Sequence, residues 1–206
     1  MKICYYLDLP TDEYIWFARA SIASVRSVMP GAEIVLMTTT QWAGPDLGVD
    51  NVRRLNLPMD CFYGYRKYFS QSTIEGDSLF LDVDCIVQKD VSGIFEREFD
   101  ITVCYRCETD PLKRMLPFNG GVVFSRCPEF WKEATGNPGD HKDWVDPERR
   151  LSETATNDAY LVRAIDGNVY NYTPNLPGED LSGKAIVHYK GRRKEFVLPG
   201  ITECAA

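Results

Sequence analysis

The sequence predicts one α/β domain over residues 1–206, with a mixed and mostly parallel central sheet flanked by helices. Its length is sufficient for one well-buried domain and short for two. Residues 1–40 contain an apolar strand, an amphipathic helix and a second apolar strand, which is the β-α-β order that builds a parallel sheet. Apolar runs of strand length then recur as far as residue 189.

The N-terminal unit has clear start and stop signals. Residues 2–9 are predicted to form a short apolar strand. Thr11 can cap a helix whose first turn carries two acids, and apolar residues recur at helical spacing as far as Met29. Pro30 and the glycine after it end that helix. Residues 33–39, EIVLMTT, then read as a buried strand.

The remaining elements are apolar runs separated by turn-forming residues. The pattern predicts a loop over 40–51 and strands over 51–57, 78–88, 101–106, 120–126, 168–173 and 184–189. It predicts helices over 65–75, 128–135 and 153–165. Residues 136–150 are polar and rich in turn formers, so we expect a mobile loop or lid there, and residues 195–206 form a C-terminal tail.

Charge and hydropathy exclude several classes of protein. The formal net charge is −7, whereas broad nucleic-acid binding requires a basic surface. No run of about 18 uncharged apolar residues occurs, so we expect no transmembrane segment. Residues 1–14 contain acids and lack the apolar stretch of a secretory signal, so we expect a cytoplasmic protein.

The seven cysteines favour a reducing compartment over a disulfide framework. Their number is odd, and several lie in apolar, strand-like runs, where cysteine acts as a small hydrophobe. Cys104 and Cys107 form a CxxC motif, but no second pair has the spacing of a zinc site. We therefore expect ordinary thiols, with a structural zinc site as the alternative.

Two aspartates interrupt the most strand-like run of the chain, LFLDVDCIV. On a strand, Asp82 and Asp84 would share a face, so their carboxylates would lie side by side. Two carboxylates in apolar surroundings are unfavourable unless a cation or a proton joins them, and hard oxygen ligands suit Mg²⁺ or Mn²⁺. The alternative is a strand end that reaches water with two solvated acids.

A histidine and a basic cluster follow the last predicted strand. The sequence HYKGRRK places His188, Gly191 and Lys194 in an HxxGxxK pattern. Imidazole is a suitable third ligand for a Mn²⁺ site, glycine allows close approach of the backbone, and the cations match a diphosphate. The alternative is a histidine at a strand end followed by a solvated basic tail.

Together these motifs resemble the GT-A glycosyltransferases, which have a Rossmann-like nucleotide-diphospho-sugar transferase domain. The resemblance is to family eight in particular, the glycogenin and lipopolysaccharide galactosyltransferase group. Four parts match in order: a Thr-Asp-x-Tyr turn at residues 11–14, Arg66 one helix ahead of the LFLDVD strand, FNGGVVFS at 118–125, and HxxGxxK. The resemblance spans about residues 2–196.

The resemblance implies a role for each matching position. The metal, Mn²⁺ or Mg²⁺, would be held by Asp82, Asp84 and His188, with Asp82 also touching the ribose. The base pocket would be lined by Leu7, Asp8, Thr11 and Tyr14. Arg66 would approach the sugar nucleotide. The donor sugar would contact Asn119, Gly120 and Gly121, and the diphosphate would be held by Gly191 and Lys194. The alternatives are a core role for Tyr14, a solvated charge at Arg66 and a turn without ligand at 119–121.

The implied reaction is transfer of a sugar from a nucleotide-diphosphate sugar, expected to be a UDP-sugar, to an unidentified acceptor hydroxyl. Catalytic candidates are Asn119, Lys194 and Asp158. The family often carries Asp-Gln at the start of a late helix, whereas residues 156–159 here read TNDA, so Asp158 is the candidate acid and retention stays open. The alternatives are a nucleotide-sugar-binding module without turnover, a DxD metal-dependent phosphatase and a sugar nucleotidylyltransferase.

Overall fold

The computed structural model describes residues 1–57, 60–106 and 112–197. Its strands are β1 (Lys2–Tyr6), β2 (Glu33–Thr39), β3 (Asn51–Leu55), β4 (Ser78–Leu81), β5 (Cys85–Val87), β6 (Ile101–Tyr105), β7 (Phe118–Ser125), β8 (Val162–Ile165) and β9 (Ile186–His188). Its helices are α1 (Asp12–Val28), α2 (Tyr63–Gln71), α3 (Pro128–Thr135), α4 (Val145–Ala155) and α5 (Gly167–Tyr170). Short 3-10 segments are η1 (Ser92–Glu96), η2 (Pro138–Asp140) and η3 (Gly191–Phe196).

A seven-stranded sheet organises the molecule, with the strand order β3-β2-β1-β4-β7-β6-β8. Neighbouring strands from β3 to β4 are parallel, β7 runs antiparallel to both β4 and β6, and β8 is parallel to β6. The second sheet pairs β5 with β9 in antiparallel register, so that Cys85 lies opposite His188. The predicted fold class, a mixed and mostly parallel sheet with flanking helices, is therefore confirmed.

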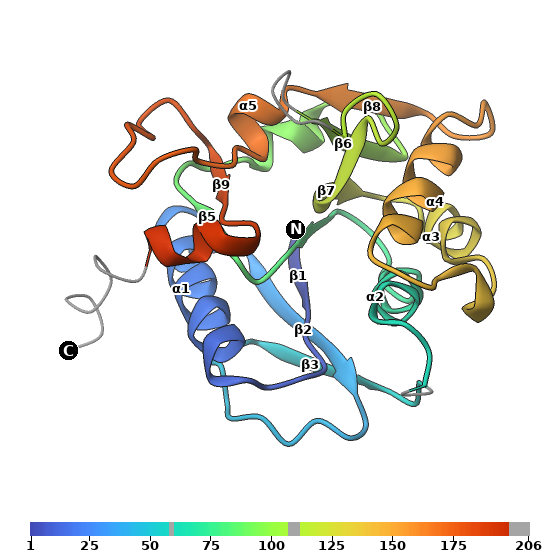
Figure 1. Ribbon diagram of the computed structural model, residues 1–206, viewed down its shortest axis with the longest axis horizontal. Helices are drawn as coiled ribbons and strands as arrows, with labels where there is room; N and C mark the ends of the chain where they lie inside the picture. Colours follow the sequence, from blue (N-terminus) through green and yellow to red (C-terminus); the bar gives the residue numbers. More distant parts are fainter. Residues whose placement is uncertain (58–59, 107–111, 198–206) are drawn as a thin grey trace.

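Helices cover both faces of the main sheet. Figure 1 shows α1 on one face and α2, α3 and α4 together on the other. Side chains of β1 alternate between two apolar cores: Ile3 and Tyr5 pack on the α1 side, and Cys4 and Tyr6 pack on the side of the other helices. Burial on both faces explains why this strand reads as a continuous apolar run.

The N-terminal elements match their predictions closely. α1 begins after Thr11, whose hydroxyl accepts a hydrogen bond from the backbone N–H of Tyr14 at 3.3 Å. β2 covers residues 33–39 as predicted, and α3 covers residues 128–135. β1 and β3 are shorter than predicted by three and two residues at their carboxyl ends. These elements carry local cap and stop signals, so their prediction did not require knowledge of tertiary contacts.

The prediction of one strand over residues 78–88 is wrong. β4 ends at Leu81, residues 82–84 form a turn, and β5 leaves the main sheet to pair with β9. A hydrogen bond of 3.1 Å from Cys85 N to Asp82 O closes the turn. Strand alternation therefore does not bring Asp82 and Asp84 to one face, and their proximity has to come from the turn and its partners.

Three predictions in the C-terminal half are also wrong. The expected loop over 136–150 contains η2 and the start of α4, and the helix expected over 153–165 ends at Ala155 before β8 begins. The strand expected over 168–173 is instead α5, capped by Asp166, which accepts from Asn168 N at 2.8 Å. β8 forms because it pairs with β6, a contact that local periodicity does not reveal.

Some predictions concern residues at the edge of the description. In the predicted C-terminal tail, residues 195–196 belong to η3, and residues 198–206 lie outside the described residues. Cys107 of the CxxC motif also lies outside them, whereas Cys104 is buried. Among residues 1–57, 60–106 and 112–197, no helix has both the length and the apolar character that a membrane span requires.

Candidate functional site

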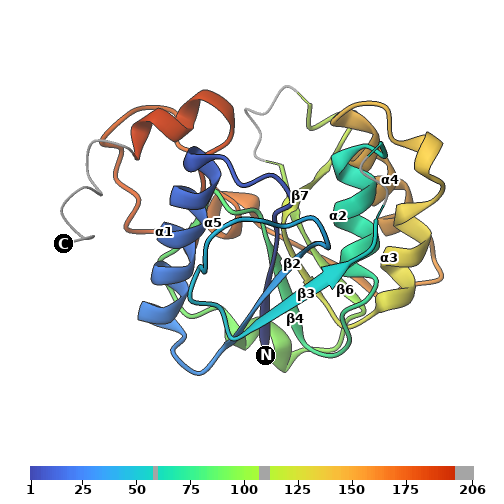
Figure 2. The ribbon, with the colours of Figure 1, turned by 90° about the horizontal axis from the view of Figure 1, so that it is seen from below.

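A cavity of about 450 Å³ opens where β1 and β4 end. Leu7 and Asp8 follow β1, and the turn at residues 82–84 follows β4, so both segments reach the cavity from the carboxyl ends of parallel strands. In α/β sheets this edge is where ligands bind. In Figure 2 the N-terminus, where β1 begins, lies at the lower edge of the molecule, and α2 and η3 extend above the far end of the sheet.

The turn after β4 meets the end of β9 at the cavity. Nε2 of His188 lies 3.1 Å from Oδ1 of Asp84 and 3.6 Å from Oδ2 of Asp82. The pairing of β5 with β9 positions this histidine, because its register sets His188 opposite Cys85, next to Asp84. Lys194, from η3, contacts the other carboxylate oxygen of Asp84 at 2.8 Å. The structure thus brings together four residues of the two predicted motifs.

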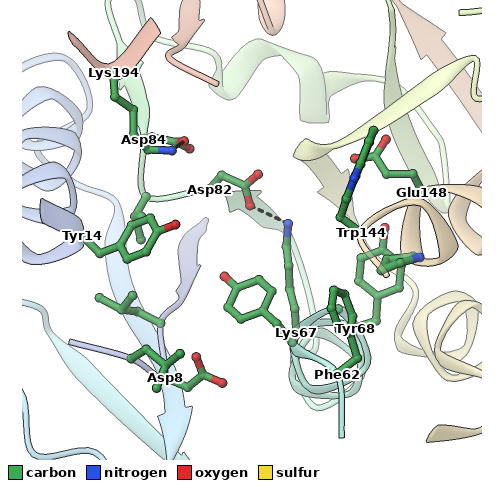
Figure 3. Close-up of a pocket in the computed structure, with 16 residues that line it drawn as sticks. Asp8, Tyr14, Phe62, Lys67, Tyr68, Asp82, Asp84, Trp144, Glu148 and Lys194 are labelled. Carbon is green, nitrogen blue, oxygen red and sulfur yellow. Dashed lines mark hydrogen bonds and ion pairs between the residues drawn. The ribbon is translucent and has the colours of Figure 1, made fainter. Parts of the chain in front are cut away.

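A second lysine lies on the opposite side of the turn. Nζ of Lys67, from α2, is 2.5 Å from Oδ1 of Asp82 and donates to the carbonyl oxygen of Gly120 at 3.0 Å. Figure 3 shows this contact as a dashed line at the centre of the cavity. Burial lowers the pKa of Lys67, but the charge of Asp82 outweighs burial and raises it, so the ammonium form is retained.

Four ion pairs set the electrostatics of the site. They are Asp82 with Lys67, Asp84 with Lys194, Asp8 with Arg66, and Glu148 with Arg106. Burial raises the pKa of Asp84, but the protonated form of His188 together with Lys194 outweighs burial and holds the pKa well below the usual value of a carboxyl group. The two formal charges of each pair cancel, so binding of an anionic ligand would require an additional positive charge.

Two glycines of β7 lie directly against these groups. A Cβ added to Gly121 would lie 2.2 Å from Cε1 of His188 and 2.9 Å from Oδ2 of Asp82. A Cβ added to Gly120 would lie 2.8 Å from the hydroxyl of Tyr68. All three distances are shorter than real contacts of a Cβ atom, so the close approach of His188 and Tyr68 to the strand requires glycine at these positions.

The donor set fits a divalent cation. Carboxylate oxygens of Asp82 and Asp84 and the ring nitrogen of His188 are hard or borderline ligands of the kind that bind Mn²⁺ or Mg²⁺. Cys85 offers a different set, because its Sγ lies within 4.8 Å of ligand atoms of Asp84 and His188. Its thiol is buried and points to the carbonyl oxygen of Gly121 at 3.6 Å, and burial raises its pKa well above the usual value. We therefore favour the oxygen-rich set.

The side of the cavity formed by β1 and α1 contains three of the predicted base-pocket residues. Leu7, Asp8 and Tyr14 line the cavity, and Figure 3 shows Tyr14 and Asp8 opposite Lys67. Oδ2 of Asp8 accepts from Arg66 at 2.7 Å and from the hydroxyl of Tyr6 at 2.9 Å. Oδ1 of Asp8 is buried and has no hydrogen-bond partner among the described residues.

Other predicted residues lie near the cavity without lining it. Thr11 is the cap of α1, and Gly191 begins η3 with a positive φ of 55°. Arg66 is buried beneath Asp8, and the next residue of α2, Lys67, is the one that faces the cavity. Asn119 is also buried, and its amide is held by Glu148 and by a second asparagine. Roles for these residues in ligand binding stay predictions.

Asp158 is separated from the cavity. It lies exposed in the turn after α4, three residues before Leu161, which hydrogen-bonds with Asp100 at the start of β6. β6 is antiparallel to β7, and β7 is antiparallel to β4, so the start of β6 lies at the amino ends of the parallel strands. The cavity lies at their carboxyl ends, so the structure corrects the assignment of Asp158 as a catalytic residue.

The carboxylate that α4 contributes to the cavity is Glu148, in the first turn of this helix. Together with Lys67 and Trp144, it lines the cavity, and the sequence reading did not identify any of the three. A signal for α4 was present: Pro147 and two acids mark a helix N-terminus. No comparable signal singles out Lys67 from its neighbour Arg66, since both lie on the same predicted helix.

Solved glycosyltransferase structures resemble the whole chain. An active-site mutant of LgtC matches with a TM-score of 0.58 and 15% identity, over 97% of this chain and 96% of that one. A glycosyltransferase involved in glycosylation of the major capsid of PBCV-1 matches with a TM-score of 0.63 and 13% identity, over 94% and 98%. GlyE of Streptococcus pneumoniae TIGR4 matches with a TM-score of 0.64 and 15% identity, over 93% of this chain and 54% of that one.

Sequence comparison alone gives no such match: neither a protein-family model nor a curated protein matches the chain. At identities of 12–15% the structural likeness establishes the fold, and the activity has to be argued from the site. The TM-scores and the extent of the match confirm the resemblance at the level of the fold. The chain has the GT-A fold, the fold of glycosyltransferases such as LgtC.

Proposed function

We propose that the protein transfers a sugar from a UDP-sugar to an acceptor hydroxyl, with Mn²⁺ or Mg²⁺ held by Asp82, Asp84 and His188. The observation that carries the proposal is the meeting of two segments about one hundred residues apart in sequence. Both carboxylates approach one nitrogen of His188, at 3.1 and 3.6 Å, at the wall of a cavity of about 450 Å³. A cavity of this size suits a small ligand.

The charge of the site supports a metal as the partner of the diphosphate. The carboxylates that line the cavity are each matched by one cation, so the described residues of its lining present no excess positive charge to an anion. A divalent cation would supply that charge and would act as a Lewis acid on the leaving diphosphate. Lys194, already at Asp84, is positioned to add a fixed positive charge at the same end of the cavity.

Features of the β1 side support a uracil base. The ring of Tyr14 borders the cavity and provides a surface on which a base can stack. The partner-free Oδ1 of Asp8 is a buried acceptor that requires a donor, and N3–H of uracil is such a donor. Cytosine offers an acceptor at the same ring position. We therefore favour a UDP-sugar over a CDP-sugar.

The carboxylates of the cavity bear on the mechanism. Asp8, Asp82, Asp84 and Glu148 are all engaged by cations, so none is placed as an unengaged general base within the described residues. Retention of configuration would suit such a site, because the acceptor hydroxyl can pass its proton to the departing phosphate. Glu148 borders the side of the cavity away from Tyr14, and we propose that this part receives the sugars.

Two other functions would use the same residues. A nucleotide-sugar-binding module would keep the cavity and the metal without turnover. A DxD phosphatase would use Asp82 as a nucleophile, but this carboxylate is held by Lys67 at 2.5 Å and shares His188 with Asp84. The cytoplasmic location expected from the sequence stays a prediction.

A panel of UDP-, GDP- and CDP-sugars, each with and without Mn²⁺, tests the proposal. A ligand at about 100 times its Kd stabilises the native state by about 2.7 kcal/mol, which is about 5–10 °C in Tm for a chain of this size. We expect such a shift only for UDP-sugars with Mn²⁺, followed by transfer or slow hydrolysis of the same sugar. Equal shifts without metal would contradict the metal site, and binding without any turnover would support the binding module.

A further inference from the structure

A continuous network of hydrogen bonds leads from Glu148, which lines the cavity, through two buried asparagines to His188. Nδ2 of Asn119 donates to Oε1 of Glu148 at 2.9 Å, and Nδ2 of Asn171 donates to Oδ1 of Asn119 at 2.8 Å. Oδ1 of Asn171 then lies 2.9 Å from Nδ1 of His188. The side chains of both asparagines and of His188 are buried, so water does not substitute for these contacts.

The direction of each hydrogen bond follows from two groups that have one role only. A carboxylate can only accept, so Asn119 must turn its NH₂ group toward Glu148. The backbone N–H of Gly121 can only donate, and it points to Oδ1 of Asn119 at 3.1 Å, which fixes the same orientation independently. Oδ1 of Asn119 then requires a donor from Asn171, so the carbonyl oxygen of Asn171 faces His188.

The carboxylate at the start of the chain is itself held in place. Arg106 donates to Oε2 of Glu148, while the backbone N–H of Gly120 donates to Oε1 at 3.2 Å. Each oxygen of Glu148 therefore accepts from a group that can only donate. Glu148 has to remain an acceptor, so the NH₂ group of Asn119 has to remain turned toward it. Glu148 therefore determines the donor–acceptor direction of every hydrogen bond in the network, although two asparagines separate it from His188.

We propose that Glu148 acts as a positioning residue for His188, setting its tautomer through Asn119 and Asn171. Since Oδ1 of Asn171 can only accept, Nδ1 of His188 must carry the proton. In the neutral ring the other nitrogen, Nε2, then presents its lone pair to Asp82 and Asp84, which is the form that can ligate a cation. The role of the cation rests on the proposed function, whereas the position of the proton does not.

Without this hydrogen-bonded network, the tautomer of His188 with its proton on Nε2 would be favoured. A lone pair on Nε2 that faces two carboxylates is repelled by them, whereas an N–H at the same place would donate to Asp84 at 3.1 Å. The contact with Asn171 is the interaction that opposes this exchange. Glu148 therefore links the sugar side of the cavity to the metal side without touching either aspartate.

The second histidine of the sequence provides an internal reference. Nε2 of His141 lies 2.7 Å from the carbonyl oxygen of Thr135, which can only accept, and its Nδ1 has no partner among the described residues. His141 should therefore carry its proton on Nε2, the opposite arrangement from His188. One spectrum of the protein should contain both tautomers.

The experiment is a long-range ¹H–¹⁵N correlation spectrum of the full chain with ¹⁵N-labelled histidine, at about pH 8.5, where a free imidazole is neutral. Protonated and unprotonated ring nitrogens resonate in separate ranges, and His141→Gln assigns the signals. We expect a protonated Nδ1 for His188 in the metal-free protein, and an unprotonated Nε2 when diamagnetic Mg²⁺ is added. An unprotonated Nδ1 with a protonated Nε2 in the metal-free protein would overturn the proposal.

Two variants test whether the chain causes this state. Asn171→Ala removes the acceptor at Nδ1, and Glu148→Gln presents an NH₂ group either to Arg106 or to Asn119, which destabilises the original direction. Both should move His188 toward the Nε2–H tautomer, and Asn171→Ala should raise the Kd of Mn²⁺ by about 10–100-fold, measured by electron paramagnetic resonance. Glu153→Gln, an exposed acid on the same helix, is the matched control and should leave the tautomer of His188 unchanged.

The outcomes separate this inference from the proposed function. A His188 tautomer that is unchanged in both variants would refute the role of Glu148, whatever the protein catalyses. If the tautomer changes as expected but wild-type protein binds no Mn²⁺, the positioning role of Glu148 is supported and the proposal of a metal-dependent transferase is wrong. A signal of His141 that stays constant in all variants excludes general unfolding as the cause of the change.

Discussion

The two sides of the cavity are built from different kinds of structure. On one side, Asp8 and Tyr14 come from the end of β1 and the first turn of α1, within the parallel unit at the start of the chain. On the other side, Lys67 comes from α2, Trp144 is the residue before α4, and Glu148 lies in the first turn of α4. Figure 3 shows these two groups facing each other, with Asp82 of the turn between them and Asp84 on the side of Tyr14.

This difference leads us to expect base binding on the β1 side and sugar transfer on the helical side. The β1 side is anchored by strand hydrogen bonds and offers one aromatic ring and one acceptor that needs a donor, which suits a flat base. The helical side depends on the contact between α2 and α4, where a Cβ on Gly64 would lie 2.0 Å from Cγ of Pro147. Base binding and sugar transfer should therefore be separable by mutation, whereas a change at the turn should affect both.

The largest effect is expected at the turn that the two sides share. Asp84→Asn keeps the shape of the side chain but removes the negative charge that faces His188 and Lys194. We expect kcat/KM to fall by about 10³-fold or more, with loss of the dependence on Mn²⁺, because charge on the leaving diphosphate is no longer stabilised. Initial rates over a Mn²⁺ titration measure this, and full activity would refute the metal assignment.

Asp158→Asn is the matched control for that substitution. It makes the same chemical change in an exposed turn at the opposite edge of the sheet. Its kcat/KM should stay within about twofold of wild type, as is usual for exposed positions away from a site. A loss comparable to that of Asp84→Asn would reinstate the role that the sequence resemblance implied for Asp158.

On the β1 side, Tyr14→Ala should weaken nucleotide binding. Stacking of a base on an aromatic side chain contributes about 1–3 kcal/mol, so the Kd of UDP with Mn²⁺ should rise by about 10–100-fold. Tyr14 is 37% exposed, so the Tm of the ligand-free protein should change little. Calorimetry gives the Kd, and kcat at saturating donor should be nearly unchanged. An unaltered Kd would place the base elsewhere.

The two sides also differ in how much of them the sequence predicts. Strand β2 and the cap of α1 follow from local signals: a capping Thr11, a Pro-Gly stop and apolar periodicity. The base-side residues Leu7, Asp8 and Tyr14 are instead implied by the family resemblance. The local signals act over a few residues and operate in the same way in most contexts. The fold class followed from the same β-α-β unit, which restricts the rest of the sheet.

The helical side depends on contacts between distant segments. β8 exists because it pairs with β6, and Asn171 has its function because it meets Asn119, 52 residues earlier. Periodicity contains no information on such pairs, so it predicts a helix over 153–165 and a strand over 168–173, where the structure has β8 and α5. Glu148 escapes prediction for a different reason. The polar composition of residues 136–150 predicts a loop, although Pro147 and the neighbouring acids mark the start of a helix.

On the helical side, Gly64→Ala should separate the two functions. The added methyl group would clash with Pro147, so α4 must shift, and overpacking of this kind costs about 1–3 kcal/mol. We expect Tm to fall by about 5 °C and kcat to fall by about tenfold, while the Kd of UDP changes little. Gly139→Ala is the control, because a Cβ there meets nothing within 4 Å. Equal effects of the two substitutions would contradict the role of the α2–α4 contact.

The smallest effect distinguishes a direct from an indirect role of Thr11 on the β1 side. The resemblance places this residue in the base pocket, whereas its hydroxyl caps α1 by accepting from Tyr14 N at 3.3 Å. Loss of a helix cap costs about 1 kcal/mol, so Thr11→Ala should lower Tm by about 2–4 °C. UDP affinity should fall only about two- to threefold, because Tyr14 lies in the turn that loosens. Thr11→Ser keeps a capping oxygen and should restore both values; a tenfold loss of affinity in Thr11→Ala at unchanged Tm would instead indicate direct contact with the nucleotide.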